Sequence, residues 1–251
     1  MRKLRLVGGM LVVAFLLLPV SPAVAQQWSW PEEPENLQVL EGFSGRRLRA
    51  VMTGFTRALG VRCAYCHVGE DGEPLSTYDF ASDEKLTKNT ARTMLGLLGD
   101  VNARLKTIEP SGDKAVNMWC HTCHRGRPRP MTIEEELGET FRAEGFEAAL
   151  AQYDDLRENF YGRGAYNFDE NGLNNFGYEV LGTGDVDGAI AVFEKNVEMF
   201  PESSNLYDSL GEGYMERGDT ELAITNYEKS LELNPQNQNA VTKLEELRRD
   251  G

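Results

Sequence analysis

The residues best suited to chemistry are the four cysteines and two of the three histidines, which fall into two copies of one pentapeptide. The copies are Cys63-Ala-Tyr-Cys66-His67 and Cys120-His-Thr-Cys123-His124. Thiols separated by two residues lie about one helical turn apart. They can therefore attach to both vinyl groups of a porphyrin while the adjacent histidine ligates the iron. This pattern is typical of covalently bound haem c.

Two other kinds of site use paired cysteines. Structural zinc sites take four ligands each, and zinc does not require a histidine directly after the second cysteine. A thioredoxin-like dithiol is single and lies in a strand–helix–strand unit, which the sequence does not predict. The sequence therefore predicts two haem c groups. The attachment residues are Cys63, Cys66, Cys120 and Cys123, and the proximal iron ligands are His67 and His124.

The second axial ligand of each iron has several candidates. His121 is the one remaining histidine, so two bis-histidine haems cannot form within one chain, and its place between two attached cysteines favours a packing role. Methionine is the usual alternative to histidine. We predict Met52 for the first iron and Met94 for the second, with Met118 and Met131 as alternatives at the second. Core packing is the competing role for a methionine on an apolar helix stripe.

Two helices are expected to carry these methionines. One apolar stripe consists of Leu48, Met52, Phe55 and Leu59, and the other of Ala91, Met94, Leu98, Val101 and Leu105. Steps of three and four residues are those of an amphipathic helix. Gly60 is expected to end the first helix, and Thr87 or a neighbour to begin the second. A loop containing Pro110 then leads to the second motif.

The N-terminus has the pattern of an export signal, predicted to comprise residues 1–25. A basic start is followed by an apolar stretch and by the small-residue cleavage site Ala23-Val-Ala25. The mature chain is then expected to begin near Gln26 and to be periplasmic or extracellular. The alternative is an uncleaved N-terminal membrane anchor, although so short an apolar run spans a bilayer poorly.

The charges divide the chain into two unlike parts. Residues 26–130 contain 14 Lys and Arg against 13 Asp and Glu, whereas residues 131–251 contain 9 against 27, and the whole chain has a net charge of −14. We expect a nearly neutral cytochrome domain at 26–130 and an acidic domain at 131–251. This acidity argues against nucleic acid as a partner, because binding phosphates requires clustered positive charge. It favours redox partner proteins with a basic docking face.

A Pro- and Arg-rich stretch marks the boundary between these two parts. It contains Arg125, Arg127 and Arg129. Guanidinium groups match carboxylates in a planar, two-bonded geometry, so one prediction is that they bind haem propionates. The alternative is a solvated linker.

The acidic part contains an internal repeat with a period of 34 residues. The positions that recur are Gly177/Gly211, Asp185/Asp219, Ala189/Ala223, Ile190/Ile224, Phe193/Tyr227 and Pro201/Pro235. This period and pattern are typical of tetratricopeptide repeats, in which helix pairs stack side by side. Residues 133–160 are expected to form a third, degenerate pair, and 241–249 a capping helix. The fold class is therefore mainly α.

The first half of the sequence also resembles a known family. The segments that carry the resemblance are Asn36-Leu-Gln-Val-Leu40, Met52-x-x-Phe-Thr-Arg-Ala-Leu-Gly-Val-Arg-Cys-Ala-Tyr-Cys-His-Val68 and Cys120-His-Thr-Cys-His-Arg-Gly126. They are similar to the cytochrome c subunit of photosynthetic reaction centres. The resemblance implies that each haem lies beside a helix supplying a methionine, which pairs Met52 with His67 and Met94 with His124. That family usually carries four haems, whereas this chain has two motifs followed by repeats.

These features predict an exported dihaem c-type cytochrome that relays single electrons, with a repeat module for docking or assembly. Donation to a membrane electron-transfer complex is one role consistent with the resemblance. One alternative is a dihaem peroxidase-like enzyme in which one iron keeps an open position. Another is a repeat scaffold or polymer subunit that carries haems and assembles with itself through the repeats.

Overall fold

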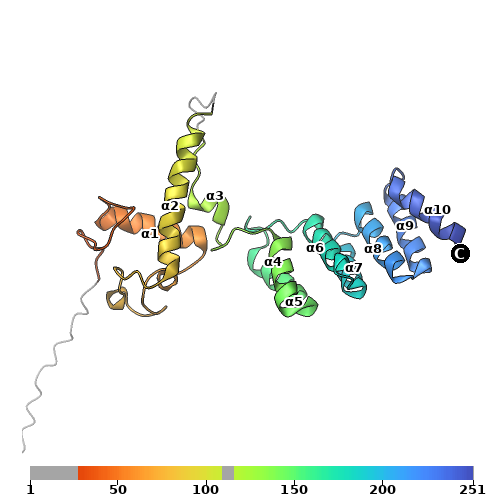
Figure 1. Cartoon of the computed structure of the whole chain (residues 1–251), viewed down its shortest axis with the longest axis horizontal. Helices are drawn as coiled ribbons and strands as arrows, with labels where there is room; N and C mark the ends of the chain where they lie inside the picture. Colours follow the sequence, from red (N-terminus) through yellow and green to blue (C-terminus); the bar gives the residue numbers. More distant parts are fainter. Residues whose placement is uncertain (1–27, 109–115, 251) are drawn as a thin grey trace, which may run out of the picture.

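The computed structural model describes residues 28–108 and 116–250, and within these ranges the regular structure is helical. The predicted mainly α fold class is confirmed. The predicted signal peptide and the loop containing Pro110 lie outside the described residues. Figure 1 shows an elongated molecule, with the two motif-bearing segments at one end and stacked helix pairs at the other. None of the described helices is both long and apolar enough to cross a membrane.

Three α-helices build the motif-bearing part. They are α1 (Gly45–Leu59), α2 (Leu86–Leu105) and the short α3 (Cys120–His124), accompanied by single 3-10 turns at Cys63–Tyr65 and Leu75–Thr77. The first apolar stripe lies on α1 and the second lies on α2, as predicted. Gly60 ends α1 in the left-handed conformation, with φ of 67°. In Figure 1, α2 rises across the long axis of the molecule.

Gly60 is a position where a side chain cannot be added. Its left-handed conformation costs an L-residue about 1–2 kcal/mol, and a Cβ there would clash with the backbone carbonyl of Gly126. We therefore expect Gly60→Ala to lower the free energy of unfolding by at least about 2 kcal/mol. Urea denaturation followed by circular dichroism measures this. Gly54→Ala is the control, because Gly54 lies within α1 with open space around its Cα, and alanine there should stabilise by about 0.5–1 kcal/mol.

The acidic part consists of three helix pairs and a final helix, as predicted. They are α4 (Ile133–Glu144) with α5 (Phe146–Phe160), α6 (Glu170–Gly182) with α7 (Val186–Met199), α8 (Ser204–Arg217) with α9 (Thr220–Leu233), and α10 (Gln238–Asp250). One buried apolar cluster runs through them from Ile133 to Leu244. The stack of helix pairs is therefore continuous, because α4 contacts both α5 and α6.

The repeat is built on a glycine that faces an aromatic ring. A Cβ on Gly177 would clash with the ring of Phe193, and 34 residues later a Cβ on Gly211 would lie 3.1 Å from the ring of Tyr227. Both rings are fully buried, at 1% and 0% exposure. The absence of a side chain at each glycine therefore lets a large ring fill the space between paired helices.

Candidate haem sites

The motif-bearing part contains a partly open cavity of about 600 Å³. Its wall comes from the N-terminal segment 28–40, from α1, from the first motif, from the loop 77–81 and from α2. Met52, Cys63, Cys66 and His67 all line it. The structure therefore brings the predicted distal ligand, both thiols and the proximal histidine of the first motif to one cavity.

The local backbone explains how the first motif reaches this cavity. After Gly60 reverses the chain, the motif coils into a tight turn. The backbone N–H groups of Cys66 and His67 both donate to the carbonyl of Cys63, at 3.2 and 3.0 Å. This turn holds the two thiols and the imidazole at the cavity wall. None of the four cysteines of the chain is in a disulfide.

The environment of His67 suits a metal ligand. Its Nδ1 is buried and has no hydrogen-bond partner in the described part of the chain. Its ring meets the ring of Phe80 edge to face, with 5.0 Å between centroids. Burial and the nearby charge of Lys88 lower the pKa of His67 to about 4. At neutral pH the imidazole is therefore uncharged, which is the form that ligates iron.

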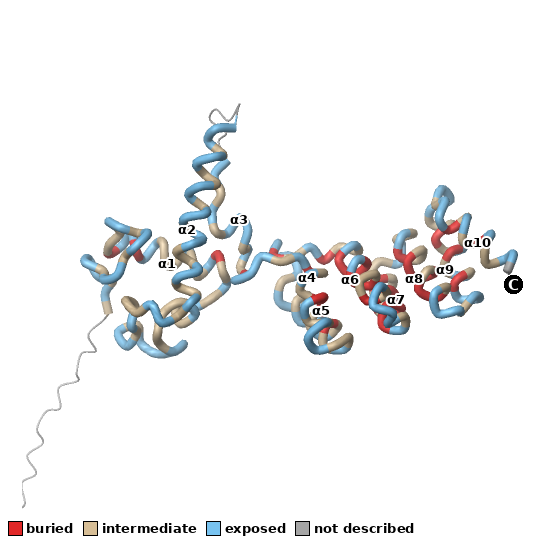
Figure 2. Tube along the Cα trace, in the orientation of Figure 1, coloured by how far each residue is buried: buried red, intermediate tan, exposed pale blue. Residues whose placement is uncertain are grey.

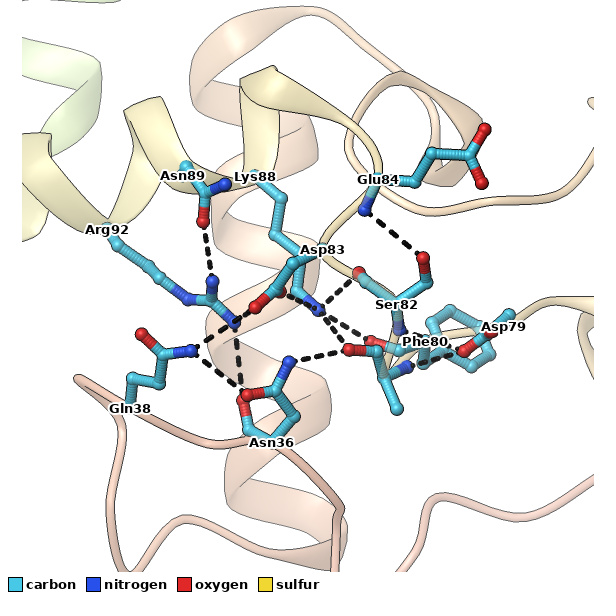
Figure 3. A network of polar contacts seen from close by, with 11 residues as sticks. Asn36, Gln38, Asp79, Phe80, Ser82, Asp83, Glu84, Lys88, Asn89 and Arg92 are labelled. Atoms are coloured by element: carbon cyan, nitrogen blue, oxygen red, sulfur yellow. Dashed lines mark hydrogen bonds and ion pairs between the residues drawn. The ribbon is translucent and has the colours of Figure 1, made fainter.

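A polar network fixes the cationic side of the cavity (Figure 3). The ammonium of Lys88 donates to the carbonyls of Phe80, Ala81 and Ser82, at 3.1, 3.0 and 2.7 Å. It also pairs with Asp83 at 3.0 Å, as does Arg92 at 2.8 Å. These cations hold the pKa of the Asp83 carboxyl well below its usual range.

The same network attaches the N-terminal segment to the loop that precedes α2. Asn36, which has a left-handed φ of 57°, donates from Nδ2 to the carbonyl of Ala81 at 2.6 Å, and Gln38 Nε2 lies 3.3 Å from Asp83. Lys88 and Arg92 both line the cavity and are 11% and 13% exposed at their side chains. Two cations with one carboxylate between them therefore lie beside the first motif.

The second motif forms the whole of α3. Its histidine, His124, has its Nδ1 2.9 Å from the carbonyl oxygen of Arg127. Because a carbonyl only accepts, Nδ1 carries the proton and Nε2 is left free to ligate. The residues before α3 are held to α2 by Asn102, whose amide bonds both the N–H and the carbonyl of Met118, at 2.7 and 2.9 Å.

The two motifs meet at the end of α1. Gly126, directly after the second motif, donates its N–H to the carbonyl of Ala58 at 2.8 Å. Ala58 is in the last turn of α1, two residues before the glycine that leads into the first motif. The fold thus places both pentapeptides around one helix end.

The candidate methionines are placed differently at the two motifs. Met52 lines the cavity of the first motif. Met94 lies on α2 but is 42% exposed, whereas its stripe neighbours Leu98 and Val101 are half-buried. The backbone of Met118 lies next to α2 through Asn102. The pairing of Met52 with His67 is consistent with the cavity, and the second distal ligand stays a prediction.

The three linker arginines contact the repeat module. Arg129 forms two hydrogen bonds with the carboxylate of Glu139, each 2.9 Å, and Arg125 donates to the carbonyl of Gly164 at 3.3 Å. Arg127 is only 7% exposed. Arg127 is therefore not part of a solvated linker, whereas Arg125 and Arg129 are exposed, and binding of propionates by these arginines stays a prediction. The segment attaches the second motif to the repeats.

The motif-bearing part also fits a large apolar group because it has almost no core of its own. Among described residues before 131, the buried hydrophobic residues are Leu48 and Ala58, while the other buried hydrophobics lie in the repeat module (Figure 2). The cavity beside the first motif is lined by Trp28, Leu48 and Phe55 among others. The mainly apolar cavity, the uncharged, half-buried imidazole and the two thiols together fit a covalently attached haem.

Sequence comparison agrees with this chemistry. Residues 18–160 match the family described as photosynthetic reaction centre cytochrome C subunit. The chain belongs to that family. Residues 204–237 match the tetratricopeptide repeat. The family match includes α4 and α5, so it extends past the predicted boundary at residue 130.

One curated relative is cytochrome c-554 of Chloroflexus aurantiacus, which is 38% identical over 94 residues. The match covers 37% of this chain and 20% of the relative, so the chain corresponds to about a fifth of that protein. Membership of the family identifies this chain as a c-type cytochrome, a class of protein that carries covalently bound haem.

Solved structures of tetratricopeptide repeat domains are similar to part of this chain. The first TPR domain of human RPAP3 has a TM-score of 0.35 and 17% identity, covering 47% of this chain and 87% of that one. The Sgt2 TPR domain of Aspergillus fumigatus has a TM-score of 0.35 and 18% identity, covering 47% and 76%.

Proposed function

We propose that this protein is an exported dihaem c-type cytochrome that passes single electrons between redox partner proteins. One haem is attached to Cys63 and Cys66 with His67 as proximal ligand. The other is attached at the second motif, through the residues Cys120, Cys123 and His124. The observation that carries the proposal is the cavity that brings Met52, Cys63, Cys66 and His67 together.

The chain's own residues decide what the cofactor can do here. Bound haem iron supplies a reversible one-electron couple. At the first site Met52 and His67 lie on the wall of one cavity, and if both held the iron, no ligand position would be left for a substrate. Most of this wall is apolar. Residues with these roles favour electron transfer over catalysis at this haem.

Domain boundaries follow from the same argument. We assign residues 1–25 to an export signal, 26–130 to the dihaem domain and 131–251 to the repeat module, in which α4 and α5 begin the stack. Attachment of haem c occurs outside the bacterial cytoplasm, so the proposal requires export. Terminal sequencing of the periplasmic protein should begin near Gln26, and a cytoplasmic product that retains residue 1 would contradict it.

The haem count is the decisive measurement. We expect the purified full chain to contain two haem c groups, counted by the pyridine haemochrome spectrum against protein determined by amino-acid analysis. Fewer than two groups would refute the dihaem assignment. A low-spin ferric spectrum would support six ligands at both irons. A spectrum of the reduced protein that does not change on addition of CO would support the same conclusion.

A second candidate is favoured by one observation. Met94 is 42% exposed, and the second motif packs against α1 rather than against α2, the helix that carries Met94, so the described part of the chain adds no support for Met94 as the second distal ligand. If no residue fills that axial position, the second iron keeps an open site, as in a dihaem peroxidase. High-spin ferric signals from one of two haems, together with cyanide binding, would establish this alternative.

The repeat module is proposed to bind a partner or to assemble copies of the chain. Its 27 acidic against 9 basic residues favour a partner with a basic face. Light scattering on the full chain and on a chain ending at residue 130 distinguishes the two roles. Oligomers that disappear on truncation indicate assembly, and a monomer in both cases indicates docking.

A further inference from the structure

The second haem motif has a feature that the first lacks, a doubly bonded turn beyond its histidine. Arg127 donates its backbone N–H to the carbonyl of His124 at 2.9 Å, and its own carbonyl accepts from Nδ1 of the same histidine at 2.9 Å. The imidazole is thus oriented by the backbone of one residue. A carbonyl partner on Nδ1 fixes the orientation and raises the basicity of a ligating histidine.

The side chain of that residue belongs to a different part of the molecule. The guanidinium carbon of Arg127 lies 3.7 Å from the ring centroid of Tyr166, in the connection between α5 and α6. Its Nη1 is 3.7 Å from Oε1 of Glu136 on α4. The hydroxyl of Tyr166 donates to the same oxygen at 2.9 Å. Arg127 is therefore enclosed by the repeat module.

This enclosure leaves stacking and charge as the interactions that position Arg127. Its Nε and Nη1 are buried and make no hydrogen bond within the described residues. A buried guanidinium over an aromatic ring is stabilised by the negative electrostatic potential on the face of the ring, and more strongly when water is excluded. Movement of Tyr166 or Glu136 would thus be transmitted to the backbone of Arg127.

The first motif has no equivalent connection. Nδ1 of His67 is without a hydrogen-bond partner in the described ranges, and its neighbours come from the loop 77–81 and α2. The repeat module is therefore connected through Arg127 to His124, and no such connection leads to His67. A partner that binds the repeats has a physical means of affecting the second haem and not the first.

We propose that Arg127 is a positioning residue for the second haem, through which the repeat module sets the orientation of the axial histidine His124. The inference rests on the proposed function, because it requires His124 to ligate iron. It makes the repeats a regulator of one redox centre as well as a docking element.

The test replaces Tyr166 in the full, haem-loaded chain. Tyr166→Leu keeps an apolar side chain but removes the ring and the hydroxyl. The expected result is a rise in the midpoint potential of the second haem, since a loosened Nδ1 bond makes the imidazole a weaker donor to iron. Exchange of the His124 Nδ1 proton with solvent, followed by NMR of the reduced protein, should also become faster. The first haem should keep its potential.

Two further variants separate this effect from general damage. Tyr166→Phe keeps the ring over Arg127 and should restore the wild-type potential. Arg129→Gln breaks the exposed pair with Glu139 in the same linker and should change neither haem. If Tyr166→Leu does not fold, Glu136→Gln removes the partner charge with little change of shape and is expected to act in the same direction.

Each outcome decides something definite. A second haem whose potential and proton exchange are unchanged in both Tyr166→Leu and Glu136→Gln would overturn the inference. Equal shifts at both haems would overturn it too, because the change would then be general. A wild-type chain without haem at the second motif would instead refute the proposed function. The chain with Cys120→Ala and Cys123→Ala gives the potential of the first haem alone, and subtracting its titration from that of the full chain gives the potential of the second.

Discussion

Replacing both cysteines of the first motif, Cys63→Ala with Cys66→Ala, should reduce the covalent haem count from two to one. It should also unfold the region around the cavity, since the lost group is the expected filling of about 600 Å³. Pyridine haemochrome spectra give the count, and limited proteolysis of residues 28–108 reports the loss of structure. The repeat module should stay folded, because its core is separate and continuous from Ile133 to Leu244.

The size of this effect follows from where the protein has its core. Before residue 131 the buried hydrophobic residues that the structure describes are Leu48 and Ala58, so little apolar surface remains to hold α1 and α2 together without a ligand. A group that binds the folded form alone stabilises it by a free energy that grows with the logarithm of its affinity, so removing the group removes that stabilisation.

The matched control is Cys120→Ala with Cys123→Ala. It should also leave one haem, but the cavity of the first motif should keep its filling, so residues 28–108 should stay resistant to protease. Equal proteolysis in both double variants would contradict the cavity assignment. Two haems remaining in either variant would contradict the attachment residues themselves.

The sequence predicted those parts of the fold that depend on a regular period. The helix pairs of the repeats were found because glycine, alanine and aromatic positions recur every 34 residues, and the glycine–ring contacts at Gly177 and Gly211 show why that pattern is retained. The end of α1 was predicted because glycine is the residue type that best tolerates the left-handed conformation common at helix ends, and Gly60 adopts it with φ of 67°. In each case the residue type at the position has a single structural cause, so it could be recognised in the sequence.

The residues that the sequence analysis missed act through contacts between distant segments. The N-terminal segment 28–40 forms part of the cavity wall, and Asn36 is bonded to Ala81 across 45 residues. No period or motif marks such a pair, although Asn36 begins one of the segments that carry the family resemblance. Likewise, a run of arginines in a linker gave no indication that Arg127 would be buried.

The second large prediction concerns the charge beside the first haem. Lys88 lines the cavity, pairs with Asp83 and lowers the pKa of His67, so its charge is felt at the ligand. A positive charge disfavours the oxidised iron, which carries one more positive charge than the reduced iron. Lys88→Met should therefore lower the midpoint potential of the first haem. At about 10 Å and an effective dielectric constant of about 20, one charge is worth about 1–2 kcal/mol, roughly 40–90 mV for one electron.

Asp83→Asn provides the control with the opposite sign. It removes a negative charge from the same network, which is bonded to Arg92 and Lys88, and should raise the potential of the first haem. Both substitutions break hydrogen bonds in one cluster, so disruption of the cluster would shift the potential in the same direction in both. Redox titration in the chain lacking Cys120 and Cys123 measures the first haem alone. Shifts of opposite sign establish an electrostatic effect, and shifts of the same sign contradict it.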